Sequence, residues 1–202
     1  MSPVAVDLSD LLAGAAALYR DFPAGAADEV ADRLAALAPS ATGVRMPGDP
    51  PPPVSEYLKQ ALASPARHAL AASVPADPVL LPWQEGKFVM PAGFKGRYMF
   101  CVLVGPEEPV RADDFLFGLY MQAPNTDYPS HAHAAVEYYA VLSGEAAWEK
   151  NLDGYAPQPP GSCILHASYQ WHAMRTGDDP LLAIWAWTGD LNNETYKMME
   201  TA

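Results

Sequence analysis

The sequence predicts a mainly β protein with an N-terminal α-helical extension, and two patterns along the chain support this. Apolar residues of the first third recur at the helical period of 3.6 residues, whereas the chain after Pro82 consists of short β-rich runs bounded by Gly, Pro, Asn and Asp. The 202 residues are 50% hydrophobic and 18% charged, so a sizeable core is available and global disorder is excluded.

Three helices are expected before Pro82. The first carries one apolar face, formed by Leu8, Leu11, Leu12, Ala15, Ala16 and Tyr19. The second runs from about Ala26 to Leu37 and is ended by Pro39, and the third covers roughly Ser55 to Ala63. We therefore expect residues 1–80 to form a helical extension and residues 81–202 to form a β-barrel with the metal site, both folding as one unit.

Seven strands are expected after Pro82, covering residues 97–104, 115–122, 136–142, 145–150, 163–165, 171–175 and 181–188. Turn signals separate them, for example Ser143-Gly144-Glu145. Short strands at such regular spacing are typical of antiparallel hairpins that close into a sandwich or barrel.

Composition and charge narrow the possible partners. The net charge is −12, and most of it lies in residues 101–202, with 4 basic and 14 acidic side chains. Such a half repels phosphate backbones, which argues against nucleic acid and anionic membranes and favours cationic or zwitterionic ligands. Two cysteines, no 18-residue apolar run and no positively charged leader favour a reducing, cytoplasmic location. A monomer and a homodimer both remain open.

The chemistry is concentrated in a short segment that contains His131, His133, Glu137 and Tyr139. In one extended strand without a bulge, these odd-numbered side chains would all face the same side. Burying two imidazoles, a carboxylate and a phenol together is costly unless something pairs them, and a divalent metal ion is the economical partner. Zinc, iron, manganese, cobalt and nickel all suit such nitrogen and oxygen ligands.

The segment also matches a known family pattern. His-x-His-x3-Glu-x6-Gly, from His131 to Gly144, is similar to the first motif of the cupin superfamily. The second motif then falls on Gly161 and His172, although its Pro, second Gly and Asn are replaced by Ala167, Tyr169 and Thr176. The resemblance implies a cupin (double-stranded β-helix or jelly-roll) barrel with His131, His133, Glu137 and His172 at its site.

A narrower resemblance rests on Tyr128-Pro-x-His-x-His-x3-Glu-x-Tyr139, the helical extension and a tryptophan-rich last strand. The chain resembles the cupin-type dimethylsulfoniopropionate lyases, closest to the Q type. This implies that His133, Glu137, His172 and in some states Tyr139 hold the metal, with His131 as ligand or near neighbour. It further implies that Tyr139 is the base, with Tyr128 assisting or acting in its place.

This reaction explains the residue types. Dimethylsulfoniopropionate loses an α-proton and expels neutral dimethyl sulfide, so the reaction needs a base and an electrophile but no general acid. A phenolate can serve as the base, and a divalent metal bound to the substrate carboxylate serves as the electrophile. Trp185 and Trp187 share a strand face and are expected to hold the sulfonium. Further candidate aromatic residues are Tyr98, Tyr120, Tyr138 and Trp171.

Other readings remain open at this stage. A related metal-binding cupin, such as an isomerase or dioxygenase acting on another small carboxylate, would share the metal motif, and so would a non-catalytic ligand-binding cupin. A phenol base distinguishes the lyase from an oxygenase, which instead needs open iron positions. His68 and His166 are expected to be ordinary structural residues.

Overall fold

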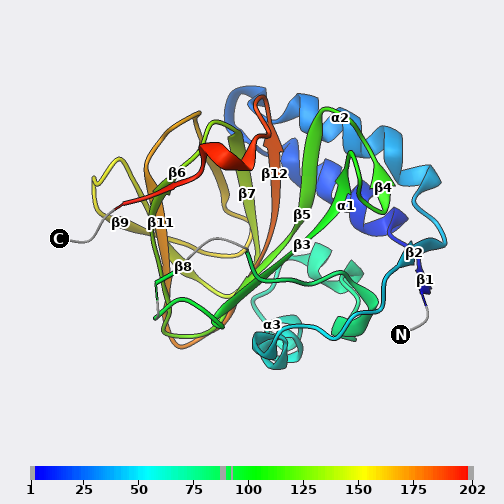
Figure 1. Ribbon diagram of the computed structural model, residues 1–202, viewed down its shortest axis with the longest axis horizontal. Coiled ribbons are helices and arrows are strands. Elements are labelled where there is room, and N and C mark those ends of the chain that lie inside the picture. Colours follow the sequence, from blue (N-terminus) through cyan, green and yellow to red (C-terminus); the bar gives the residue numbers. More distant parts are fainter. Residues whose placement is uncertain (1–2, 87–89, 92, 200–202) are drawn as a thin grey trace.

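Two facing sheets form the body of the protein (Figure 1). The structure is a computed structural model and describes residues 3–86, 90–91 and 93–199. The six-stranded sheet has the order β10 (Cys163–His166), β7 (Val136–Ser143), β12 (Leu181–Thr188), β5 (Phe115–Gln122), β3 (Tyr98–Gly105) and β4 (Val110–Arg111). The five-stranded sheet has the order β13 (Lys197–Met198), β6 (Asp127–Ala132), β11 (His172–Thr176), β8 (Ala146–Lys150) and β9 (Tyr155–Gln158). All pairings in these two sheets except β3–β4 are antiparallel.

Each of the seven expected strands is present, within about two residues of its expected ends. The sequence pattern missed β4, β6, β9 and β13, and also a small separate sheet of β1 (Val4–Val6) and β2 (Val44–Met46). Four of the missed strands, β1, β2, β4 and β13, have only two or three residues, too few to show a period.

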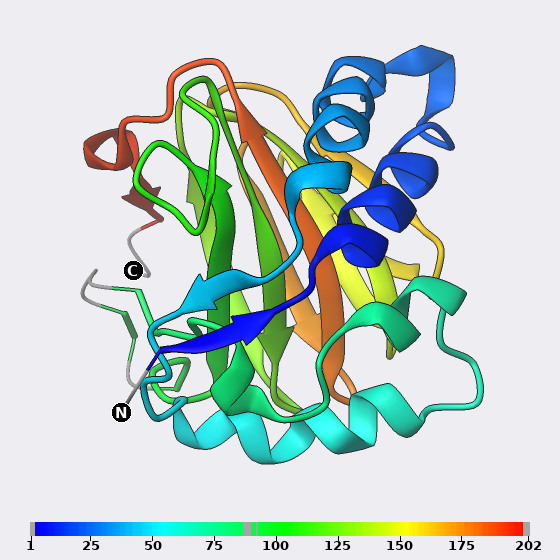
Figure 2. The same ribbon diagram turned by 90° about the vertical axis from the view of Figure 1, so that its right-hand side faces the viewer.

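The helical extension covers one face of the six-stranded sheet (Figure 2). Helices α1 (Ser9–Tyr19) and α2 (Asp28–Leu37) match the expectation, but the third helix is shorter, because a 3-10 turn at Pro53–Tyr57 precedes α3 (Leu58–Ala63). None of the helices in the described part of the chain is long and apolar enough to span a bilayer. The division at residue 80 and folding as one unit stay predictions.

The six-stranded sheet separates two hydrophobic clusters. Its outer side chains pack with the helices around residues such as Leu12 and Leu34, and its inner side chains pack against the five-stranded sheet. Along β7 the side chains alternate, so Tyr138 and Ala140 face the helices whereas Glu137 and Tyr139 face the barrel interior. The barrel interior therefore receives the two residues of β7 that the sequence selected as candidates.

Two turn positions explain how the motifs fit this backbone. Gly144, between β7 and β8, has a φ of +75°, and a Cβ there would lie 2.1 Å from the carbonyl oxygen of Pro180. Tyr169, which stands where the second cupin motif has glycine, also adopts a positive φ of 58°. The backbone thus keeps the glycine conformation at residue 169 although the side chain has changed.

Candidate metal centre

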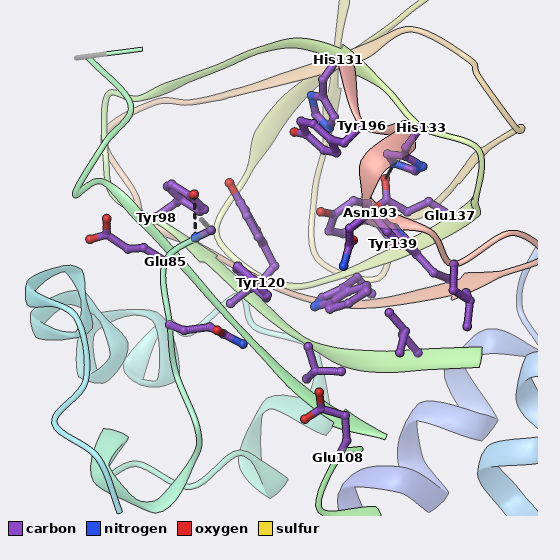
Figure 3. Close-up of a pocket in the computed structure, with 18 of the residues that line it drawn as sticks. Glu85, Tyr98, Glu108, Tyr120, His131, His133, Glu137, Tyr139, Asn193 and Tyr196 are labelled. Carbon is purple, nitrogen blue, oxygen red and sulfur yellow. Dashed lines mark hydrogen bonds and ion pairs between the residues drawn. The ribbon is translucent and has the colours of Figure 1, made fainter. Parts of the chain in front are cut away.

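The four odd-numbered residues of the His-x-His-x3-Glu segment do not lie on one strand. His131 belongs to β6 in one sheet, Glu137 and Tyr139 belong to β7 in the other, and His133 lies on the connection between them. The expectation of a single uninterrupted strand was therefore wrong, because the chain crosses from sheet to sheet at residues 133–135. The side chains still meet, since both sheets turn their inner faces toward one cavity (Figure 3).

Three imidazoles are oriented by their own local backbone. Nδ1 of His131 lies 2.9 Å from the carbonyl oxygen of Pro129, and Nδ1 of His133 lies 3.1 Å from that of Ala135. Nδ1 of His172 lies 2.8 Å from the carbonyl oxygen of Gln170. A carbonyl oxygen only accepts hydrogen bonds, so each Nδ1 is the donor, and in a neutral imidazole Nε2 then keeps a lone pair suited to a metal.

Three of the facing polar atoms are buried without a hydrogen-bond partner in the described structure: Nε2 of His133, Nε2 of His172 and Oε2 of Glu137. Oε2 lies 3.4 Å from the first nitrogen and 3.1 Å from the second. Ligands held about 2.0–2.2 Å from one ion lie about 3.0–3.4 Å apart, so both distances from Oε2 are compatible with a shared divalent metal. His131 completes a group with His133 and His172 whose ligand nitrogens lie within 4.8 Å of one another.

The charges at this point suit a cation. Burial alone would raise the pKa of Glu137, but the imidazoles of His133 and His172 outweigh it and hold that pKa well below its usual range. Burial, followed by the neighbouring His172, lowers the pKa of His131 well below its usual value. Metal binding requires an ionised carboxylate and neutral imidazoles, and the lowered pKa values of Glu137 and His131 are in the required direction.

Strand register gives Glu137 two neighbours that the sequence motif does not contain. Trp187 pairs with Glu137 across β12, and its Nε1 donates a hydrogen bond of 2.6 Å to Oε1 of the carboxylate. His166 pairs with Glu137 across β10, and its ring stacks on that of His172 at 3.9 Å between centroids. Neither ring nitrogen of His166 has a hydrogen-bond partner in the described structure, and Glu137, His166 and His172 form a second group of converging ligand atoms. The expectation of an ordinary structural histidine at 166 stays a prediction.

The cavity beside these ligands has a volume of about 770 Å³, and Figure 3 shows His131, His133, Glu137 and Tyr139 near one another at one end. Tyr128 also lines it. Burial, followed by the negative charge of Glu137, raises the pKa of Tyr139 well above its usual value. Its phenol therefore keeps its proton unless a nearby positive charge offsets these effects.

The aromatic candidates divide between the two sides of the sheet. Trp185 and Trp187 both line the cavity, with ring centroids 5.8 Å apart, and so do Tyr98 and Tyr120. Tyr138 instead packs edge-on against Tyr19 of α1, since it occupies an even position of β7. Tyr138 and Trp171 are not among the described residues that line the cavity, so neither is retained as a candidate.

Sequence reasoning missed Tyr196, which follows a 3-10 turn near the C-terminus. Its hydroxyl oxygen lies 2.5 Å from that of Tyr128, and its ring stacks near His131 at 5.1 Å between centroids. The one signal for Tyr196 in the sequence is that an aromatic residue directly follows a mainly polar segment, residues 190–195. No motif spacing connects that segment to the histidines.

Comparison with known proteins identifies the family. The family model of the dimethylsulfoniopropionate lyases matches residues 26–183. The chain belongs to this family. It is 32% identical over 167 residues to DddL of Cereibacter sphaeroides, whose assignment as a dimethylsulfoniopropionate lyase is provisional, over 79% of this chain and 69% of that protein. It is 38% identical over 103 residues to the dimethylsulfoniopropionate lyase DddQ of Ruegeria pomeroyi, a match that covers 50% of each protein.

The structural comparison extends along almost the whole chain. The crystal structure of DddQ from Ruegeria pomeroyi matches with a TM-score of 0.68 and 25% identity, covering 96% of this chain and 97% of that one. The predicted mainly β cupin fold and the predicted lyase family are therefore confirmed. The individual roles of Tyr139, Tyr128, Trp185 and Trp187 stay predictions.

Proposed function

We propose that this protein is a metal-dependent carbon–sulfur lyase that cleaves dimethylsulfoniopropionate to dimethyl sulfide and acrylate. One observation carries the proposal beyond the family assignment. Three buried ligand atoms, from His133, Glu137 and His172, converge without other partners, and Tyr139 is the next inward residue of β7 after Glu137. A candidate ion site and a phenol are thus available beside the same cavity.

The proposed cofactor is one divalent transition metal, held by His133, Glu137 and His172, with His131 and Tyr139 as adjacent donors. Zinc, iron, manganese, cobalt and nickel all suit this donor set. Once bound, the metal supplies a Lewis acid for the substrate carboxylate, which makes the α-proton more acidic.

Tyr139 is the proposed base. Its pKa is raised by burial and by Glu137, so the phenolate needs compensating positive charge nearby. Tyr128, on β6 of the facing sheet, lines the same cavity and is proposed to assist. Its pKa is also raised, first by burial, although the hydrogen bond with Tyr196 opposes that shift.

The reaction balances without any further reactant. The phenolate oxygen of Tyr139 takes the α-proton, the electrons of the broken C–H bond form the C=C bond, and the C–S bond breaks. Dimethyl sulfide leaves as a neutral molecule, acrylate remains, and the proton passes from Tyr139 to solvent.

The charged side chains that line the cavity suit a zwitterionic substrate whose sulfonium lies away from the metal. The lining residues that the structure describes include Glu85, Glu107 and Glu108 but no Lys or Arg, so the metal is the expected partner of the substrate carboxylate. The indole rings of Trp185 and Trp187 are proposed to face the sulfonium, where a cation gains about 0.5–2 kcal/mol.

The test is product analysis with the purified protein, stripped of metal and then loaded with one metal at a time. We expect dimethyl sulfide in the headspace and acrylate in solution in equal amounts, with no oxygen consumed. Oxygen uptake would favour a dioxygenase instead. Absence of both products with every metal at millimolar substrate would refute the proposed function.

His133→Ala supplies the control for the ion site. We expect elemental analysis to find stoichiometric metal in the wild type and loss of it in this variant, and retention would contradict the proposed ligands.

The cytoplasmic location and the choice between monomer and homodimer stay predictions.

A further inference from the structure

The C-terminal segment 189–199, here called the strap, runs along one edge of the cavity. Strand β13 of the strap pairs with β6 at His131 and Ala132, and the amide of Met199 donates to the carbonyl oxygen of Ser130 at 2.8 Å. The hydroxyl oxygen of Thr195 accepts a hydrogen bond from the amide of Ala134 at 3.1 Å. The strap is therefore bound to the backbone that carries both metal-motif histidines.

The strap contributes three side chains to the cavity wall, Leu191, Asn193 and Tyr196. Figure 3 shows Tyr196 beside His131, at the same end of the cavity as His133 and Glu137. Its ring lies nearly parallel to both imidazoles, with centroids 5.1 Å from His131 and 6.0 Å from His133. A residue more than fifty positions beyond the histidine motif thus lies against it.

The ring of Tyr128 is held between two flat neighbours. Phe94 stacks on one side at 4.3 Å and His131 stacks at 4.2 Å, both within 20° of parallel. The remaining polar group of Tyr128 is its hydroxyl, which shares a hydrogen bond with the hydroxyl of Tyr196.

We propose that Tyr196 is a positioning residue that fixes the hydroxyl of Tyr128 at the cavity wall and makes the strap part of the active site. This role rests on the proposed lyase function, because it assigns Tyr128 and Tyr139 different tasks. The hydroxyl of Tyr128 is engaged by the strap, which leaves Tyr139 as the phenol that takes the proton.

The kinetic test is a double-mutant cycle on the metal-loaded enzyme with Tyr128→Phe, Tyr196→Phe and the combined variant. Each substitution removes a hydroxyl and keeps a ring, so packing is preserved. We expect Tyr196→Phe to lower kcat/KM by about three- to tenfold, the usual effect of one hydrogen bond. The combined variant should then lie within twofold of Tyr128→Phe alone.

Tyr155→Phe is the matched control, because Tyr155 is a partly exposed tyrosine on β9 outside the described cavity lining. It should leave kcat/KM within twofold of the wild type, and all variants should keep the wild-type metal content. Effects of Tyr128→Phe and Tyr196→Phe that multiply, or a Tyr196→Phe variant with full activity, would overturn the proposal.

A direct measurement separates this inference from the lyase assignment. In proton NMR of the zinc-loaded protein, the hydroxyl proton between two close phenol oxygens should give a strongly downfield resonance. That resonance should vanish in Tyr128→Phe and in Tyr196→Phe but persist in Tyr155→Phe. A wild type without lyase activity but with this pattern would refute only the function, and an active wild type without the resonance would refute only the role of Tyr196.

Discussion

The two faces of the six-stranded sheet use the same strands for different purposes. The outer face meets α1 and α2 through aliphatic and aromatic side chains, among them Leu12 and Leu34, which are fully buried. The inner face carries Glu137, Tyr139 and two tryptophans around a cavity. Because neighbouring residues of one strand alternate between these faces, stability and chemistry can be tested separately by adjacent substitutions.

The largest expected effect is the loss of the inner phenol. We expect Tyr139→Phe to lower the rate of dimethyl sulfide release by about 10²–10⁴-fold, the usual contribution of a positioned general base. Headspace analysis of the metal-loaded protein measures this. Tyr138→Phe, one residue along on the outer face, should stay close to the wild type, and equal losses in both variants would contradict the division of roles.

On the outer face the expected effect is on stability. Leu12→Ala removes a fully buried side chain between α1 and the sheet and should lower the free energy of unfolding by about 2–5 kcal/mol. Urea denaturation measures the loss. Activity per folded molecule should not change, whereas Leu152→Ala, at a residue that is 57% exposed, should change neither quantity.

Loss of the indole of Trp187, which donates a hydrogen bond to Glu137, should lower the affinity for the metal. Trp187→Phe keeps a ring against His133 but removes the Nε1 hydrogen bond to the carboxylate, so metal affinity should fall about 10–100-fold. Titration with a competing chelator measures this. Trp185→Phe loses only a hydrogen bond to the carbonyl oxygen of Leu119 and should keep wild-type affinity. Equal affinities in the two variants would refute the positioning of Glu137.

The smallest effect concerns His166 and pH. Burial, followed by the charge of His172, lowers the pKa of His166 well below its usual value of 6.5. Below pH 6.5 the unfolded chain therefore binds a proton that the folded protein does not, so stability falls as pH drops from 6.5 toward the lowered pKa. His166→Phe should flatten this fall by up to about 1.4 kcal/mol per pH unit.

The variant should also gain about 1 kcal/mol at pH 7.5, since two buried nitrogens without partners are replaced by an apolar ring. Urea denaturation of the metal-free protein at pH 7.5, 6.5 and 5.5 would test both effects. An unchanged pH slope would show that His166 is protonated in the folded state as readily as in the unfolded one.

What the sequence predicted depends on local periodicity. The alternation of Glu137, Tyr138 and Tyr139 along one strand could be read directly, and motif spacing selected His172 although most of the second motif was replaced. The pairing of Glu137 with Trp187 and His166 could not be read, because it depends on how β12 and β10 are aligned with β7. Tyr196 was missed because the strap has no period and binds β6 through backbone hydrogen bonds.

The three imidazoles show how such a site tolerates change elsewhere. Each is oriented by a carbonyl oxygen two positions away in its own segment, so the direction of each Nε2 is specified within a few consecutive residues. Distant side chains are not needed to aim the nitrogen donors. Side chains of the cavity walls, and with them the molecule that is accepted, could therefore change while the direction of these three nitrogens is kept.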